Sequence, residues 1–238
     1  MTETSPALDL TNVRFSWKRS SPVIDIESLT IAAGERIFLQ GASGSGKSTL
    51  LSLIAGITPP QSGQVSVLGQ DMSSLSAPLR DAFRAAHLGI IFQQFNLLPY
   101  LSLIDNVLLP CRFSAKRGQA LGSSQGSWPD AARDLLDRLG LAEVARSGRA
   151  VSKLSVGQQQ RVAAARALIG SPQFIIADEP TSALDASARG VFIDTLMKEV
   201  DRTGAALLFV SHDQSLGARF DRQISLHDIN RAIVEGAA

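Results

Sequence analysis

The sequence has little cysteine and almost no excess charge. Of its 238 residues only Cys111 is a cysteine, so the chain cannot form an internal disulfide, which fits a reducing compartment. We expect Cys111 to be a small buried apolar side chain rather than a nucleophile. With 23 Lys and Arg against 22 Asp and Glu, the formal net charge is +1, and no overall field selects nucleic acid or an anionic membrane. We therefore expect no nucleic-acid partner.

Long apolar runs are also missing. No stretch approaches the ~20 apolar residues that span a bilayer. The nearest candidate, 97–113, is interrupted by Pro99, Asp105, Asn106 and Pro110. The first residues, Met-Thr-Glu-Thr-Ser-Pro, lack the basic and apolar segments of a signal peptide. We expect contact with a membrane only through a partner.

The most informative segment that is present is a complete phosphate-binding loop. It lies between an apolar strand-like run at 36–39 and a helix-like run at 50–54. Its glycines let backbone N–H groups turn towards phosphate oxygens, and the helix that follows adds the positive end of its dipole. The alternative, a turn rich in glycine and serine, does not explain Lys-Ser-Thr. The predicted nucleotide-binding residues are Gly41, Ala42, Ser43, Gly44, Ser45, Gly46, Lys47, Ser48 and Thr49.

Two residues of this loop have predicted roles of their own. Lys47 can reach the β- and γ-phosphates of a nucleoside triphosphate, and the Ser48 hydroxyl can bind Mg²⁺. The loop therefore predicts that the chain binds ATP with Mg²⁺, with Lys47 also counted among the catalytic residues.

A second segment of an ATPase follows the apolar run at 174–177, where Asp178, Glu179 and Pro180 come in succession. At the carboxyl end of a central strand, Asp178 can hold Mg²⁺ through water. Glu179 can accept a proton from the water that attacks the γ-phosphate. A strand that ends in a charged turn is the alternative for either carboxylate alone, but it explains the pair poorly.

Residues 154–168 begin Leu-Ser-Val-Gly-Gln and continue as a helix-like run. Ser155 can cap the helix, Gly157 permits close backbone approach, and the first N–H groups offer an anion site. A capped amphipathic helix is the ordinary interpretation of this segment alone. Beside the other motifs, it resembles the signature sequence of ATP-binding-cassette (ABC) ATPases. The resemblance covers nearly the whole chain, and it implies that Ser155, Gly157 and Gln158 contact a nucleotide.

Two further residues match this family at the expected places. Trp17 matches the aromatic residue that stacks on adenine, although it could also be a core or rim aromatic. Gln93 matches the glutamine that links Mg²⁺ to the transmembrane subunit, with its neighbour Gln94 as a rival. The resemblance thus makes Gln93 both a metal ligand and a catalytic residue.

The remaining matches lie after the carboxylate pair. Residues 182–185, Ser-Ala-Leu-Asp, match the loop exchanged across the family's dimer, and Asp185 could also cap the following helix. His212 matches the switch histidine that contacts the γ-phosphate and is the fourth catalytic candidate beside Lys47, Gln93 and Glu179. His87 and His227 have no motif around them. The signature departs from the family at Val156, where glycine is usual.

The resemblance implies an ATP-hydrolysing motor subunit of a membrane ABC transporter at the cytoplasmic face of the inner (plasma) membrane. Two copies, or this chain and a related one, would trap ATP between them and act on a transmembrane permease subunit. Residues 93–110 look like the macrolide-export and lipoprotein-release branch of the family, which implies export or periplasmic mechanotransmission. The alternatives are a soluble ABC ATPase without a transport role, the ATPase subunit of an importer, or a nucleotide-gated module without turnover.

The expected fold is α/β. We predict one domain with a nucleotide-binding core at 1–93 and 156–238 and a helical subdomain at 94–155. The core should combine a mainly parallel sheet with an N-terminal antiparallel patch, because near-continuous apolar runs indicate buried parallel strands and alternating ones half-buried antiparallel strands. We expect helices at 129–139 and about 186–202, and a solvated loop at 114–128.

Overall fold

The computed structural model describes residues 5–18, 22–122 and 127–232, and the chain divides into two compact units. The first unit comprises residues 1–84 and 206–238, and the second comprises residues 85–205. The predicted division into a core and a helical subdomain at 94–155 stays a prediction. The described residues of that predicted subdomain do include several helices, as given below.

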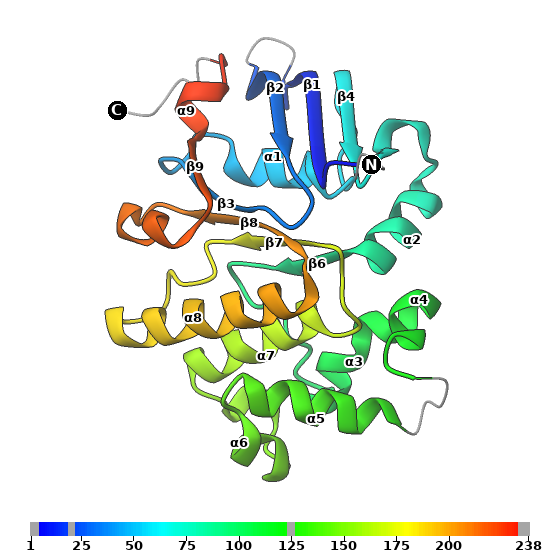
Figure 1. The fold of residues 1–238 in the computed structure, drawn as a ribbon, viewed down its shortest axis with the longest axis vertical. Coiled ribbons are helices and arrows are strands. Elements are labelled where there is room, and N and C mark those ends of the chain that lie inside the picture. Colours follow the sequence, from blue (N-terminus) through cyan, green and yellow to red (C-terminus); the bar gives the residue numbers. More distant parts are fainter. Residues whose placement is uncertain (1–4, 19–21, 123–126, 233–238) are drawn as a thin grey trace. The chain divides into compact units, whose positions relative to one another are not determined.

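The N-terminal strands of the first unit form an antiparallel sheet in the order β2-β1-β4-β5 (Figure 1). The strands are β1 (Leu8–Phe15), β2 (Ile24–Ile31), β4 (Ser62–Val67) and β5 (Gln70–Asp71). In β1 the alternation of buried and exposed side chains skips one residue between Leu10 and Val13. The register between β1 and β4 shifts at the same place, and Asn12 adopts φ 51°. A β-bulge therefore restores the apolar face, and the predicted antiparallel patch is confirmed.

The first unit also contains three parallel strands with β3 in the middle. They are β3 (Arg36–Gln40), β8 (Ala206–Ser211) and β9 (Arg222–Ser225). Ile37, Phe38 and Leu39 are fully buried, as expected of an internal parallel strand, and the Phe38 ring stacks on Phe209 at 6.3 Å between centroids. The helices that begin in this unit are α1 (Lys47–Ile54), α2 (Ala77–His87) and α9 (Leu226–Ile229).

The second unit has two parallel strands, β6 (Leu88–Ile91) and β7 (Phe174–Asp178), paired from Leu88↔Phe174 to Ile91↔Ala177. Its described α-helices (Figure 1) are α3 (Leu103–Phe113), α4 (Ala115–Gln119), α5 (Trp128–Arg138), α6 (Ala142–Arg146), α7 (Val156–Leu168) and α8 (Ala186–Thr203). The predicted helices at 129–139 and about 186–202 are confirmed as α5 and α8. The apolar side of α5 is buried as expected, through Ala132, Leu135 and Leu136.

The prediction of a solvated loop at 114–128 is wrong for its first part. Residues 115–119 form α4, and Arg117 is only 2% exposed. Its guanidinium donates to the carbonyl oxygens of Ile169 at 2.9 Å, Leu88 at 3.3 Å and Ala167 at 2.5 Å. Burial lowers the pKa of Arg117 to about 10. Residues 123–126 of the expected loop lie outside the described residues.

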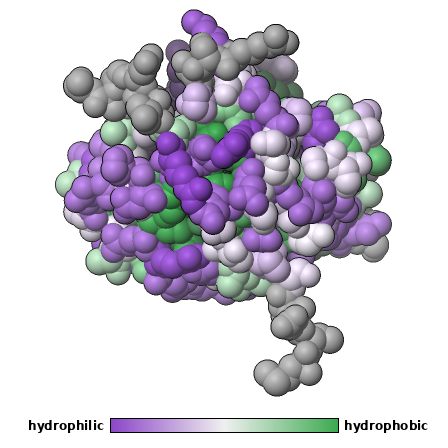
Figure 2. All heavy atoms as spheres, turned by 90° about the horizontal axis from the view of Figure 1, so that it is seen from above, coloured by the Kyte–Doolittle hydropathy of each residue, from purple (hydrophilic) through white to green (hydrophobic). Residues whose placement is uncertain are grey.

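Hydrophilic side chains cover most of the face shown in Figure 2, and hydrophobic ones appear mainly between them. Over the described part of the chain, no helix is both long and apolar enough to cross a bilayer. Cys111 is buried, and this burial raises the pKa of its thiol. The prediction that Cys111 is a buried apolar side chain is thus confirmed.

Candidate nucleotide-binding site

The loop at 41–46 joins β3 to α1 in the first unit. Gly46 is the N-cap of α1 at φ 97°, a conformation that side-chain-bearing residues rarely adopt. Because glycine has no side chain with which to cap the helix, the N–H groups of the first turn are placed to donate to an anion. A Cβ atom at Gly41 would lie 2.7 Å from Ser45 Oγ, so a side chain there would displace the Ser45 hydroxyl from its place in the loop.

Two polar side chains inside this loop fit a phosphate ligand. Ser45 Oγ is buried and has no hydrogen-bond partner among the described residues. Such an orphaned buried hydroxyl needs an explanation, and a ligand provides one. The Lys47 ammonium folds over the loop and donates to the carbonyl oxygens of Gly41 and Ala42, both at 2.8 Å. The residues therefore suit the nucleotide that the sequence predicts, because phosphate oxygens are better partners for an ammonium than carbonyls.

His212 lies at the same sheet edge as this loop. Gln40 at the end of β3 pairs with Ser211 at the end of β8, and the strands are parallel. Gly41 and His212 therefore leave the sheet side by side. His212 is exposed, whereas Ser211 is buried and accepts a hydrogen bond from the Asp213 N–H at 3.1 Å. The structure thus brings the histidine to the phosphate-loop edge, as the sequence predicted for a γ-phosphate contact.

Trp17 follows β1 and is 64% exposed. Its indole Nε1 donates to the Thr49 hydroxyl at 3.1 Å, and Phe15 packs edge to face against its ring at 4.8 Å between centroids. These two contacts fix the ring beside the first turn of α1 while leaving much of it accessible. The geometry suits a stacking platform for a base.

In the second unit, Gln93 and the carboxylate pair come from neighbouring strands. Ile91 near the end of β6 pairs in parallel with Ala177 of β7, so Gln93, Asp178 and Glu179 follow the same edge of this strand pair. Gln93 and its rival Gln94 are both exposed, so exposure does not separate them. The structure brings these residues to one edge of the strand pair but assigns no ligand to either glutamine.

Glu179 has an unusual backbone. Residues that precede proline favour extended conformations, yet Glu179, which precedes Pro180, adopts φ 46°. The residue is 8% exposed. Backbone strain of this kind costs about 1–3 kcal/mol and occurs most often at functional sites, where the surrounding structure enforces it. This strain supports the prediction that Glu179 is catalytic.

The N-terminus of α7 is capped as predicted. Ser155 Oγ accepts a hydrogen bond from the Gln158 N–H at 3.3 Å, and Gln158 Oε1 accepts one from the Ser155 N–H at 2.9 Å. This reciprocal pair is a capping box. Among the described residues, a Cβ atom at Gly157 would meet only Leu184 Cδ2, at an ordinary 3.5 Å, so no contact with them requires glycine there. Val156, the departure from the family signature, is 46% exposed.

Asp185 is the N-cap of α8 and accepts a hydrogen bond from the Ala188 N–H at 2.8 Å. The capping role that the sequence allowed is therefore confirmed. Ser182 and Ala183 before it are exposed, so the 182–185 loop lies at the surface of its unit. A contact with a second chain stays a prediction.

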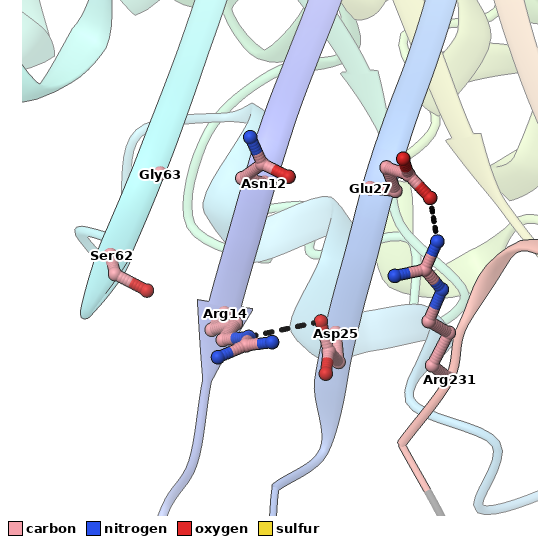
Figure 3. Close-up of a pocket in the computed structure, with 7 residues that line it drawn as sticks. All are labelled: Asn12, Arg14, Asp25, Glu27, Ser62, Gly63 and Arg231. Carbon is pink, nitrogen blue, oxygen red and sulfur yellow. Dashed lines mark hydrogen bonds and ion pairs between the residues drawn. The ribbon is translucent and has the colours of Figure 1, made fainter.

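A separate polar pocket of about 300 Å³ lies on the antiparallel sheet (Figure 3). Ion pairs within it join Arg14 to Asp25 at 3.1 Å and Arg231 to Glu27. Because its charges neutralise each other, the pocket offers little to an anionic nucleotide. None of its lining residues was predicted as a site residue: Asn12, Arg14, Asp25, Glu27, Ser62, Gly63 and Arg231.

Gln160 and Arg166, to which no sequence motif assigns a role, are buried on α7. Gln160 donates to the carbonyl oxygen of Pro180, and Arg166 donates to the carbonyls at 95 and 96. The signal for Arg166 was present, since it interrupts the apolar run 162–169 and a buried charge needs polar partners. Gln160 carried no comparable signal.

Comparisons with known proteins agree with these features. The family model described as ABC transporter matches residues 24–182. The macrolide export ATP-binding/permease protein MacB of Rhodopseudomonas palustris (strain HaA2) is 43% identical over 200 residues, which are 84% of this chain and 29% of that protein. Its namesake in Burkholderia pseudomallei (strain K96243) is 39% identical over 228 residues, 94% of this chain and 33% of the relative. The chain thus spans about a third of the length of these curated relatives.

Solved structures give the same result. A dimeric structure of MJ0796, described as a bacterial ABC transporter cassette, has a TM-score of 0.81 and 33% identity, and the match covers 92% of this chain and 93% of that one. A second dimeric structure of MJ0796, described as a post-hydrolysis state bound to ADP and Pi, has a TM-score of 0.82 and 32% identity and covers 96% of both chains. The expected α/β fold is therefore that of an ABC cassette.

Proposed function

The chain belongs to the ABC transporter family as an ATPase domain homologous to MacB-type proteins, and we propose that it is the ATP-hydrolysing motor subunit of a membrane transporter. The observation that carries the proposal is the turn between β3 and α1. There a glycine N-cap, the orphaned Ser45 hydroxyl and the Lys47 ammonium all suit a triphosphate.

Each predicted site residue has a chemical task in this proposal. The loop at 41–49 binds the phosphates, and the exposed Trp17 ring stacks on the adenine. Ser48, Gln93 and Asp178 would hold Mg²⁺. When bound, that ion neutralises charge on the β- and γ-phosphate oxygens. Glu179 accepts the proton of the attacking water, and His212 holds the γ-phosphate.

We propose that two copies, or this chain and a related one, close on ATP. Ser155, Gly157, Gln158 and Asp185 of one chain would complete the site around Lys47 of the other. Support comes from Gly157, where no described residue lies close enough to the Cβ position to require glycine, and from the dimeric state named for MJ0796. ATP then favours the closed pair, and hydrolysis reverses the preference.

The proposed partner is a transmembrane permease subunit, with this chain at the cytoplasmic face of the inner membrane. The relatives are named as macrolide export ATP-binding/permease proteins, which supports a role in export or in driving a periplasmic apparatus. Tyr100 is 79% exposed and Phe113 is 75% exposed, so two large side chains of the segment 94–113 are free of core packing. They support docking through this segment.

The central experiment replaces the proposed base. Glu179→Gln should lower steady-state phosphate release about 10²- to 10⁴-fold, the usual contribution of a general base. ATP-dependent dimerisation, measured by size-exclusion chromatography with light scattering, should persist because binding residues are intact. Glu143→Gln, at an exposed glutamate of α6, serves as the control and should keep wild-type turnover. Wild-type turnover in Glu179→Gln would show that the base is assigned wrongly.

A further inference from the structure

Helix α7 holds the backbone that follows the proposed base. Gln160 is fully buried, and its amide nitrogen donates to the carbonyl oxygen of Pro180, directly after Glu179. The other amide atom, Gln160 Oε1, has no partner among the described residues. A buried polar atom without a hydrogen bond is destabilising, and an apolar side chain at this position would avoid that cost. We therefore attribute the glutamine to its hydrogen bond with Pro180. It pins the chain next to the strained backbone of Glu179.

The same helix holds the loop after Gln93 through a second buried side chain. Arg166 is 8% exposed, and its guanidinium donates to the carbonyl oxygens of Phe95 and Asn96, both at 2.6 Å. Burial lowers the pKa of Arg166, and its two bonds go to carbonyls rather than to a carboxylate. Asn96 adopts φ 51°, a left-handed conformation that asparagine accepts more readily than most residues.

These two bonds and the signature turn lie on one rigid element. Ser155 is the N-cap of α7, and Arg166 lies eleven residues later, about 16 Å along the axis at 1.5 Å per residue. Backbone hydrogen bonds within a helix make such a segment move as one body. A displacement of the signature turn is therefore transmitted to Pro180 and to the loop at 95–96, all within the second unit.

We propose that Gln160 and Arg166 are positioning residues that couple the two ATP sites of a dimer. This inference rests on the proposed function. Ser155 contacts the nucleotide of the partner chain, and α7 carries that contact to Glu179 through Gln160 and to Gln93 through Arg166. Nucleotide at one site thus sets the geometry of the catalytic loops at the other, which is a coupling free energy between sites.

The test uses Arg166→Lys in the full chain, because lysine keeps the charge but loses the planar fork that serves two carbonyls. Arg161→Lys is the matched control. Arg161 also lies on α7 and donates to the loop carbonyls of Leu139 (3.3 Å) and Gly140 (3.2 Å) and to the Gly157 carbonyl of its own helix (3.2 Å), but to neither catalytic loop. Phosphate release is measured against ATP concentration for both variants and wild type.

Wild type and Arg161→Lys should show a Hill coefficient above 1. Arg166→Lys should bring it to about 1 and lower kcat about three- to tenfold, with half-saturation little changed, as expected when a coupling network is weakened. Hydrogen exchange in the Glu179→Gln background gives a second readout. ATP should still protect the amides of 155–159 in Arg166→Lys, whereas protection of 94–98 should disappear.

A merely structural arginine would lower protection in both segments together, and that result would overturn the inference. So would a Hill coefficient of 1 in wild type, or cooperativity retained in a folded Arg166→Lys. If that variant does not fold, Gln160→Met decides instead: kcat should fall with ATP affinity unchanged, and wild-type kcat would overturn the proposal. Absence of both ATP hydrolysis and ATP-dependent dimerisation in wild type would instead refute the proposed function itself.

Discussion

The N-termini of α1 and α7 are built in opposite ways. At α1 the N-cap is Gly46 in the left-handed region, with no side chain to satisfy the first turn. At α7 the N-cap is Ser155 in the extended region, and it exchanges hydrogen bonds with Gln158 in a complete capping box. Each N-terminus carries the positive end of its helix dipole. Of the two helices, only α7 has a side-chain cap.

This difference indicates how each of the two helix N-termini can bind phosphate. The α1 terminus suits an anion, because no side chain caps its first turn and backbone N–H groups at a helix start bind phosphate well. At α7 the capping box already uses the Gln158 N–H and the Ser155 hydroxyl, so a phosphate there must share that hydroxyl with the cap. We infer that α7 binds phosphate only when α1 of another chain presents it, which makes its contact a condition for closure rather than an independent site.

Among changes at these two helix termini, the largest effect should come from giving α1 a serine cap. Gly46→Ser forces a side chain into φ 97°, and its Cβ would lie 3.1 Å from the Val23 carbonyl oxygen. Strain of about 1–3 kcal/mol would be relieved by shifting the loop, so ATP affinity should fall roughly ten- to a hundredfold. Isothermal titration calorimetry of the variant and of wild type with ATP measures this change in the dissociation constant.

The control for Gly46→Ser places the same strain elsewhere. Gly204 ends α8 at φ 65° with open space around its Cβ position. Gly204→Ser should lower the free energy of unfolding by about 1 kcal/mol while leaving ATP affinity at the wild-type value. Equal affinity losses in both variants would mean that the loop glycine acts only on stability.

A smaller effect is expected at α7. Ser155→Ala removes the cap and should cost about 1 kcal/mol of stability, measured by urea unfolding. ATP binding by the single chain should not change, whereas ATP-dependent dimerisation in the Glu179→Gln background should weaken about tenfold, because a hydrogen bond to charged phosphate is lost. Ser155→Thr keeps the cap and should dimerise nearly as wild type. Undiminished dimerisation in Ser155→Ala would contradict the contact between the chains.

The smallest effect concerns Val156. Its branched side chain is 46% exposed next to the capping box and stands where the family usually has glycine. If it crowds the approach of a second chain, Val156→Gly should raise kcat/KM for ATP about two- to fivefold, equivalent to less than 1 kcal/mol. Stability should fall slightly, since glycine is a poor helix former. A lower kcat/KM in this variant would remove the crowding argument.

Local chemistry in the sequence predicted much of the candidate site. The glycines and Lys47 follow an apolar strand, and caps such as Ser155 and Asp185 act within three residues, so their partners are visible nearby. The strand runs likewise placed His212 and the carboxylates at strand ends, because parallel pairing brings such ends together.

What the sequence could not predict depends on distant partners. Gln160 and Arg166 bind carbonyls 20 and 70 residues away, and those carbonyls have no side-chain signature. The left-handed backbone of Glu179 opposes the ordinary preference before proline, so local rules pointed the wrong way. The prediction of a solvated loop was wrong for the same reason: Arg117 binds carbonyl oxygens far away in the sequence, and the composition around α4 does not reveal them.

The contacts of Arg117 also affect how the chain folds during its synthesis on the ribosome. Its carbonyl partners at Ala167 and Ile169 are 50 and 52 residues further along. At about 5–20 residues per second, they are made about 3–10 s after the arginine. A helix of five residues such as α4 does not persist alone, so during that interval the nascent segment is open to proteases and chaperones. We therefore expect the exposure of the α4 segment to end once α7 and Ile169 have been synthesised, because they supply these carbonyl partners.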